Sequence, residues 1–232
     1  MSSSLRDPSL YIRPACKEDA SSLSRICLLT ADAGKSAESL HAIGELPGLI
    51  FATPYVHLPH TAGFVLVRRK NSDNDKSTEE EEVIGYTATT YDSKEFQTIA
   101  EQEWYPSYCK KYPKPSENPD YYKALAISDQ DKRFIALLHA PEQVPEACLK
   151  FCPAHMHINI LPEAQKQGWG RKLVGSIVKY LRDEKGMNRV WLGIDPRNVN
   201  AAQFYTKLGF KPIEGAPSNY FGLSFDDFVF ST

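Results

Sequence analysis

The chain has 232 residues, 42% of them hydrophobic and 24% charged, which is enough for one domain with a sizeable core. Its formal net charge of −2 and sequence pI near 6.3 give no electrostatic reason to expect nucleic acid or an anionic membrane as a partner. Five cysteines without a CxxC pair indicate reduced thiols in a core and argue against a metal site.

The N-terminus, MSSSLRDPSLYIRP, lacks the apolar stretch of a signal peptide, and no apolar run approaches the length of a membrane span. The expected location is therefore intracellular, in the cytoplasm. The sequence does not fix the oligomeric state, so both a monomer and a homodimer stay open.

The first part of the chain predicts two helices and three strands. The strands are expected at residues 10–14, 63–68 and 83–90, and the helices at residues 17–28 and, more weakly, 36–43. The last two strands should pair as a hairpin. Between them, residues 71–82 are polar and end in four consecutive glutamates, which predicts a solvated, flexible hairpin tip.

The second part predicts a helix at residues 94–103, a loop without regular structure at 104–115 and a helix at 131–138. A strand at 154–161, a helix with an apolar stripe, a strand at 189–194 and a closing strand at 220–225 follow. Strands that alternate with helices, preceded by a hairpin, indicate an α/β fold with a mixed sheet.

A glycine-rich turn follows the strand at 154–161 and precedes the long helix. Gln165, Gly168 and Gly170 form the pattern QxxGxG, so main-chain N–H groups should point outward at a helix N-terminus and bind an anion. The spacing lacks GxGxxG, and no GKS or GKT follows, which argues against a dinucleotide fingerprint and a Walker loop. Thirty residues later, Asn198, Ala201, Tyr205 and Gly209-Phe210 read NxxAxxxYxxxGF.

Together the two patterns resemble the GNAT superfamily of acyl-CoA-dependent N-acyltransferases, whose motif A is [RQ]xxGx[GA]. The resemblance implies one GNAT domain over residues 1–232, with a mixed, mostly antiparallel sheet and helices on both faces. The sheet would be splayed between the parallel strands at 154–161 and 189–194, and acetyl-CoA would enter that gap. No metal is expected.

The resemblance also implies a role for each matching residue. Main-chain groups of Ile160 and Leu161 would serve the pantetheine arm, Asn198 would touch it, and Tyr205 would stand near the thioester sulfur. The turn that would line the pyrophosphate consists of Gln165, Lys166, Gln167, Gly168, Trp169, Gly170 and Arg171.

Acetyl transfer to an amine needs a neutral amine, a site for the developing oxyanion and a proton for the leaving thiolate. A strand amide can polarise the thioester carbonyl, and the Tyr205 hydroxyl can donate the proton. His155, His157 and Asn159 alternate along one strand, so they face one side of the sheet. We expect His157 as a candidate base and Asn159 as a substrate contact, although a packing role for either histidine stays open.

Four further segments resemble the acetyltransferase-like C-terminal domain of O-GlcNAcases and its stand-alone microbial relatives. These segments are LYIRPA, VIGYTATTYD, WYPSYCKKY and FCPAHMHINILP. The vertebrate domain has lost the glycine turn, whereas this chain retains it, so cofactor binding is expected here and deglycosylation is not. The resemblance implies an amino sugar such as glucosamine as acceptor, with a candidate cleft formed by Asp92, Trp104, Tyr105 and Tyr108.

The predicted reaction is direct transfer of an acetyl group to a primary amine, an amino sugar or another small molecule. A covalent acetyl-cysteine route is disfavoured, because only Cys152 lies near the motifs and it stands at the far end of the strand. Two alternatives stay open: a protein-lysine acetyltransferase, and a non-catalytic CoA-binding or partner-binding module.

Overall fold

The computed structural model describes residues 9–70 and 80–230. Its strands form one seven-stranded sheet in the order β1-β2-β3-β4-β5-β7-β6. The strands are β1 (Leu10–Pro14), β2 (Thr61–Lys70), β3 (Glu80–Thr90), β4 (His155–Ile160), β5 (Arg189–Gly193), β6 (Lys211–Pro212) and β7 (Tyr220–Ser224). Only β4 and β5 pair in parallel among these strands, which confirms the mixed, mostly antiparallel sheet.

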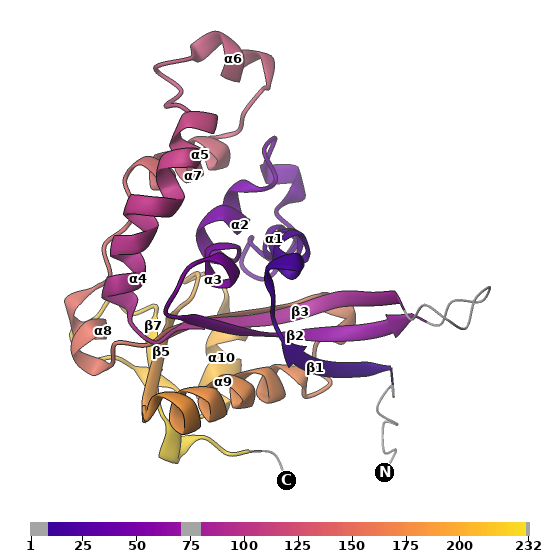
Figure 1. Cartoon of the computed structure of the whole chain (residues 1–232), viewed down its shortest axis with the longest axis vertical. Helices are drawn as coiled ribbons and strands as arrows, with labels where there is room; N and C mark the ends of the chain where they lie inside the picture. The colour runs from indigo at the N-terminus through magenta and orange to yellow at the C-terminus, as the bar shows by residue number, and fades with distance from the viewer. Residues whose placement is uncertain (1–8, 71–79, 231–232) are drawn as a thin grey trace.

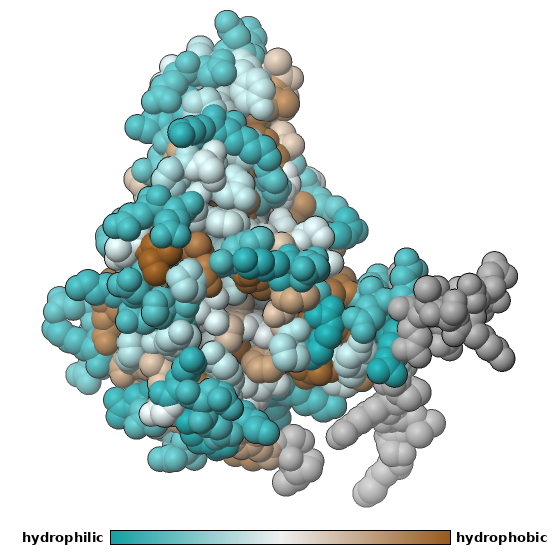
Figure 2. All heavy atoms as spheres, in the orientation of Figure 1, coloured by the Kyte–Doolittle hydropathy of each residue, from teal (hydrophilic) through white to brown (hydrophobic). Residues whose placement is uncertain are grey.

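Helices cover both faces of the sheet, as predicted (Figure 1). On one face lie α1 (Ala20–Leu28), α2 (Leu46–Phe51) and α3 (Pro54–His57), and on the other lie α9 (Trp169–Lys185) and α10 (Val199–Lys207). A column of α4 (Ser93–Ile99), α5 (Tyr105–Lys111) and α7 (Asp129–His139) rises from the sheet, with α6 (Pro119–Ala124) at its tip and α8 (Glu146–Phe151) near its base. The face of this column seen in Figure 2 is mostly hydrophilic.

The sheet is open between its two parallel strands. In the described residues, β4 and β5 share the single register pair His155↔Trp191, whereas β4 pairs with β3 over its whole length without a register shift. Beyond that pair the two strands separate toward their C-terminal ends. The predicted splay is therefore confirmed at the predicted strands.

The long helix α9 forms because its apolar residues recur at helical spacing and its ends are marked by glycine. The predicted buried stripe of Leu173, Val174, Ile177, Val178 and Leu181 is entirely excluded from solvent. Gly168 precedes the helix and Gly186 follows it, each with the positive φ that glycine adopts without strain. This stripe packs against the sheet and fixes the direction in which the helix N-terminus points.

The predicted loop at 104–115 is wrong. A π-helical turn (Ala100–Trp104) continues α4 into α5, so most of this segment is helical. Pro106 does not break this segment, because it stands in the first turn of α5, directly after the π-helical turn. Tyr105 and Tyr112 are buried among the helices of the column, and their burial stabilises the helix that proline-rich composition disfavours.

Two other expectations also need correction. The helix predicted at 36–43 is only a 3₁₀ turn (Glu38–Leu40), and the short helices α2, α3, α6 and α8 were not predicted. The predicted hairpin tip at residues 71–82 extends three residues too far, because Glu80, Glu81 and Glu82 belong to β3 and pair with Lys70, Arg69 and Arg68. The ion pair between Arg68 and Glu82, at 3.4 Å, favours this pairing. Residues 71–79 of the predicted tip lie outside the described residues.

Candidate active site

The glycine turn joins the C-terminal end of β4 to α9. After a 3₁₀ turn (Pro162–Ala164) the chain passes Lys166, with φ of 59°, and reaches Gly168, with φ of 84°. A Cβ added at Gly168 would meet no atom within 4 Å, so this position opens to solvent. The glycine is required by its backbone conformation.

Main-chain N–H groups are exposed along this turn. Within the described part of the chain, the amides of residues 166–171 have no hydrogen-bond acceptor, and the first amide that is bonded is Lys172 N, at 3.3 Å from Gly168 O. Free amides at the start of a 17-residue helix attract an anion, and the helix dipole adds to that attraction. The Lys166 and Arg171 side chains add positive charge nearby. The turn therefore fits a diphosphate.

The side chains of Gln165 and Gln167 form hydrogen bonds to main-chain carbonyl groups near the turn. Gln165 Nε2 donates to Ile160 O over 2.8 Å, and Gln167 Nε2 donates to Glu163 O over 2.7 Å. Ile160, predicted to offer main-chain groups to pantetheine, therefore has its carbonyl already engaged by Gln165. Both glutamine side chains hold the backbone in the shape that exposes the amides.

Gly170 is needed for a different reason from the one its motif suggests. A Cβ at this position would stand 2.8 Å from Cζ of Phe204 on α10. Gly170 therefore lets α9 and α10 approach each other closely. Since Phe204 directly precedes Tyr205 on α10, the same contact bears on the position of the candidate acid relative to the sheet.

The gap between β4 and β5 presents unpaired main-chain groups of β4. Leu161 N donates to Ile84 O of β3 over 2.9 Å, and peptide groups along a strand alternate between its two sides. The peptide N–H groups of Ile158 and Ile160 consequently point toward β5, beyond the last β4–β5 pair. Such amides can polarise a thioester carbonyl.

Tyr205 lies on α10, with its ring 5.2 Å from that of Phe204 and 5.3 Å from that of Phe210. The residue is 7% exposed, and burial raises its pKa, which keeps the hydroxyl protonated at neutral pH. Among the described residues its hydroxyl has no hydrogen-bond partner, yet the one buried side-chain polar atom without a partner is the Tyr86 hydroxyl. The tip of Tyr205 is therefore open to solvent, as a proton donor requires.

Asn198 caps α10. Its Oδ1 accepts a hydrogen bond from Ala201 N over 3.0 Å, and a Cβ at Gly34 would stand 3.0 Å from its Nδ2. The adjacent Arg197 forms ion pairs with Asp32 at 2.9 Å and Asp195 at 2.7 Å. The loop after β5 is thus tied to the loop after α1.

The two histidines of β4 form a buried cluster with α3 and α4. Tyr55 Oη lies 2.6 Å from His155 Nε2 and 3.0 Å from His157 Nε2, and Ser93 Oγ lies 2.6 Å from His155 Nδ1. Burial lowers the pKa of His155 well below its usual value and that of His157 to about 4. Both rings are therefore neutral at physiological pH.

Asn159, the third residue on this face of β4, is anchored to α1. Its Nδ2 donates to Thr30 Oγ1, which in turn donates to Ile26 O over 2.8 Å. This pairing occupies the amide that was expected to touch the substrate and ties β4 to the end of α1.

Of the four residues of the predicted acceptor cleft, Trp104 and Tyr108 lie together, with ring centroids 5.0 Å apart. Asp92 caps α4 by accepting from Glu95 N over 3.0 Å. Trp104 and Tyr108 line a groove with His57, which stacks on Trp104 at 5.3 Å, and Trp104 Nε1 donates to Leu49 O over 2.8 Å. The residues that line this groove do not include Tyr55, Ser93, His155 or His157 of the histidine cluster. Only Tyr105 lines a pocket beside that cluster.

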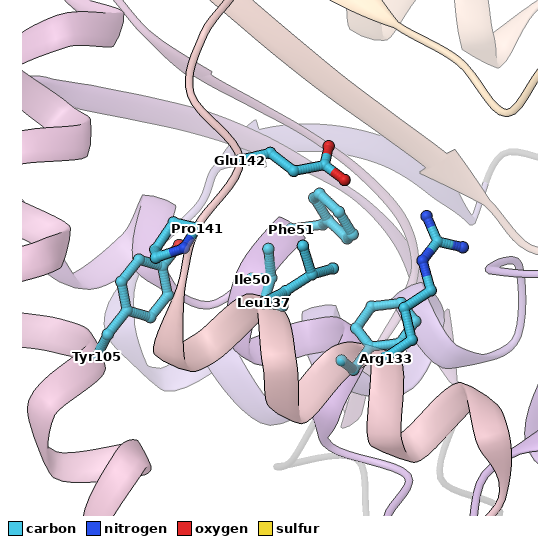
Figure 3. Close-up of a pocket in the computed structure, with 8 residues that line it drawn as sticks. Ile50, Phe51, Tyr105, Arg133, Leu137, Pro141 and Glu142 are labelled. Carbon is cyan, nitrogen blue, oxygen red and sulfur yellow. The ribbon is translucent and has the colours of Figure 1, made fainter. Parts of the chain in front are cut away.

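That pocket lies between α2, α5 and α7 and has a volume of about 130 Å³ (Figure 3). Phe51 lines it and stands 5.7 Å from the His157 ring, so the pocket borders the candidate base. Figure 3 shows Glu142 extending over Phe51, with the Arg133 guanidinium at the edge of the pocket. The pocket thus combines three aromatic rings, of Phe51, Tyr105 and Phe134, with one group of each charge.

Sequence reasoning missed Phe51, Tyr55, Ser93, Arg133 and Glu142, which the fold brings close to the site. None of them stands in a recognisable motif.

Three further observations concern a metal site, a nucleophilic cysteine and a membrane-spanning helix. Among residues 9–70 and 80–230, no set of three His, Cys, Asp or Glu side chains is arranged to hold a metal ion. Cys152 is buried, its Sγ donates to Arg189 O over 3.0 Å, and burial raises the pKa of its thiol, which does not suit a nucleophile. No helix in the described part of the chain is long and apolar enough to cross a membrane.

Comparison with known proteins gives three findings. A model of the acetyltransferase (GNAT) family matches residues 94–210. A crystal structure described as that of SsHAT is similar over 94% of this chain and 99% of its own, with 31% sequence identity and a TM-score of 0.75. The mycothiol acetyltransferases of Salinispora arenicola and Salinispora tropica are each 38% identical over 53 residues, which are 23% of this chain but only 17% of theirs.

Proposed function

The chain belongs to the acetyltransferase (GNAT) family, and from this premise we propose that it moves an acetyl group from acetyl-CoA directly to the primary amine of an amino sugar. The family relationship makes it an acetyl-CoA-dependent N-acetyltransferase. The acceptor and the roles of individual residues are the proposal.

The opening between β4 and β5 supports the proposed position of the cofactor. Acetyl-CoA would supply an activated acetyl group. The amides of residues 166–171 would hold its diphosphate, and the unpaired edge of β4 would hold the pantetheine arm. Near the last β4–β5 pair, the N–H of Ile158 would polarise the thioester carbonyl. Because these are main-chain groups, the site depends on the shape of the turn and the strand.

The candidate acid and base approach this gap from opposite faces of the sheet. His157 contacts Tyr55 on the face covered by α1–α3, whereas Tyr205 belongs to the core formed with α9 and β5. His157 would take the proton of the attacking amine, and Tyr205 would protonate the departing sulfur. Two groups on opposite sides can serve the two proton transfers without neutralising each other.

The pocket beside Phe51 supports a small polar acceptor. Phe51 and Tyr105 offer aromatic faces to a sugar ring, while Glu142 and Arg133 offer charged partners to its hydroxyl groups. Its volume of about 130 Å³ favours a small acceptor over a long chain. The amino-sugar acceptor implied by the subgroup resemblance is thus compatible with this pocket.

Acceptor profiling tests the proposal. Purified protein and acetyl-CoA would be offered glucosamine, chitosan oligomers, arylalkylamines and histone peptides, with released CoA followed by thiol detection. We expect the highest kcat/KM for glucosamine or its oligomers. A preference for histone peptides would establish the lysine alternative instead, and no heat on calorimetric titration with acetyl-CoA would remove the cofactor placement itself.

A further inference from the structure

Four side chains form an unbroken line of contacts from the core to the candidate base. The line runs from Pro153 O to Ser93 Oγ over 2.6 Å, then to His155, Tyr55 and His157. Tyr55 is 4% exposed, Ser93 0% and His155 7%. In such a dry setting each contact must contain one proton, because an unpaired or doubly occupied hydrogen bond is costly.

The carbonyl at one end fixes the direction of the line. Pro153 O cannot donate, so the Ser93 hydroxyl must donate to it across their 2.6 Å separation. Ser93 Oγ has then used its proton, and its contact with His155 is made by the Nδ1–H of the ring. A neutral imidazole has one N–H, so His155 Nε2 is left as an acceptor.

The proton positions at Tyr55 and His157 follow from that of His155. The Tyr55 hydroxyl donates to His155 Nε2, so its oxygen accepts the Nε2–H of His157 over 3.0 Å. A neutral His157 with its proton on Nε2 has an unprotonated Nδ1. In the described residues Nδ1 has no partner, and it is not among the buried polar atoms that lack one, so solvent or a ligand can reach it.

We propose that Ser93, His155 and Tyr55 are positioning residues that hold His157 in the Nε2–H tautomer and leave Nδ1 as the atom that receives the amine proton. This inference rests on the proposed N-acetyltransferase function. As the amine nitrogen bonds to the acetyl carbon, its N–H bond breaks and Nδ1–H forms. The C–S bond breaks next, and the sulfur takes a proton from Tyr205.

The line makes the base sensitive to a residue that touches neither substrate nor cofactor. In a Ser93→Ala variant, His155 Nδ1–H loses its acceptor, and the favoured arrangement moves the proton to Nε2. Tyr55 must then donate to His157 Nε2, which places the His157 proton on Nδ1 and blocks it. Reversing the tautomer of His155 therefore reverses that of His157.

Long-range ¹H–¹⁵N correlation spectra of the histidine rings test this order directly, without any substrate. We expect His155 protonated at Nδ1 and His157 at Nε2 in the unmodified protein, and both reversed in Ser93→Ala. His157 protonated at Nδ1 in the unmodified protein would overturn the proposal. This measurement does not depend on whether acetyl-CoA binds.

The Tyr55→Phe variant tests the consequence for turnover. It removes both hydrogen bonds but keeps the stacking of ring 55 on Phe96 at 4.6 Å. We expect kcat to fall roughly 10- to 100-fold with the acetyl-CoA Kd unchanged. Tyr122→Phe is the matched control, because it also deletes a buried tyrosine hydroxyl bonded over 2.6 Å to a carbonyl, that of Pro113. Its kcat should stay within about twofold.

Adding Tyr55→Phe to His157→Gln should lower kcat no further, because Tyr55 acts through His157. An additional loss equal to that of the single variant would make Tyr55 a structural residue and overturn the inference. If the unmodified protein bound acetyl-CoA and turned over, an unchanged kcat in Tyr55→Phe would reject this inference and leave the proposed function standing. If the unmodified protein did not bind acetyl-CoA, the proposed function would fail first.

Discussion

The hydroxyl of Tyr205 is the exposed tip of an otherwise buried side chain, so removing it should change chemistry without changing the fold. We expect Tyr205→Phe to lower kcat on the order of 100-fold while the acetyl-CoA Kd stays the same. Thermal unfolding should be unaffected, because the hydroxyl has no hydrogen-bond partner among the described residues. Unchanged turnover in steady-state kinetics would remove the acid role.

Gly168 should matter for cofactor binding beyond its effect on stability. Gly168→Val forces a branched side chain into φ of 84° and places it over the exposed amides, so acetyl-CoA affinity should be lost. Gly186→Val is the matched control at the other end of the same helix, since Gly186 also has positive φ and no neighbour within 4 Å.

Both glycine variants should lose about 1–2 kcal/mol of unfolding free energy in urea titrations. Only Gly168→Val should lose binding in calorimetry. Equal acetyl-CoA affinities in the two variants would contradict the anion-binding turn.

For single residues, the sequence predicts those that belong to short motifs. Gly168 and Tyr205 were predicted because each stands at fixed spacing from its neighbours in the chain. Tyr55 and Ser93 could not be predicted, because the first meets His155 across 100 positions and the second across 62. The partners of a packed histidine depend on which distant helix covers its strand, and no local pattern records that.

The start of α10 tests whether Asn198 has one role or two. Asn198→Ala removes the side-chain cap and should lower the unfolding free energy by about 1 kcal/mol, whereas Asn198→Asp keeps the cap. If Nδ2 also donates to the pantetheine arm, both variants should bind acetyl-CoA roughly 3- to 10-fold more weakly. Calorimetry with the Asp variant separates the roles, and undiminished affinity would leave Asn198 as a cap alone.

The crossing of α9 and α10 depends on Gly170. In Gly170→Ala the new methyl group would meet Phe204, at 2.8 Å in the present arrangement, and should push α10 and Tyr205 away from the sheet. We expect a loss of about 1–3 kcal/mol in unfolding free energy and a lower kcat.

Shortening the neighbour in Gly170→Ala/Phe204→Leu should recover part of both quantities. If the single variant kept full stability and turnover, the contact would not set the position of Tyr205.

Elements were predictable in proportion to their length and periodicity. Helix α9 has several turns of regular apolar spacing, and β4 reads as a continuous strand, so both were found. The four-residue α3 is too short to show a helical period, and α5 was hidden by a proline that in fact occupies its first turn. Burial of aromatic residues by the neighbouring helices decides these short elements, and that burial is a tertiary effect.

At the scale of the molecule, the site is a property of the opening in the sheet. The cofactor turn, the β4 amides and the two candidate proton-transfer groups come from different elements, and the separation of β4 and β5 after one pair would give acetyl-CoA access to them. The family pattern predicts that opening, whereas of the predicted acceptor-cleft residues only Trp104 and Tyr108 line one groove. Aromatic side chains also serve the packing of the helical column, so their density alone does not mark a binding surface.

The buried histidine cluster should make the stability of the whole protein depend on pH. The unfolded chain binds protons at both histidines as the pH falls below about 6.5, whereas the folded protein keeps the pKa of His157 at about 4 and that of His155 well below its usual value. Over this interval the unfolded state binds more protons, so the unfolding free energy must decrease as the pH is lowered.

Urea titrations between the two pKa values of His157, 6.5 and about 4, should therefore show a loss of roughly 3 kcal/mol from this residue, with His155 adding to it. His157→Gln cannot take up a proton, so its unfolding free energy should fall less steeply over the same interval. An identical slope in the variant would mean that His157 titrates normally in the folded protein. That outcome would contradict a largely buried, neutral His157 ring, because the same burial that keeps the ring neutral produces the acid sensitivity.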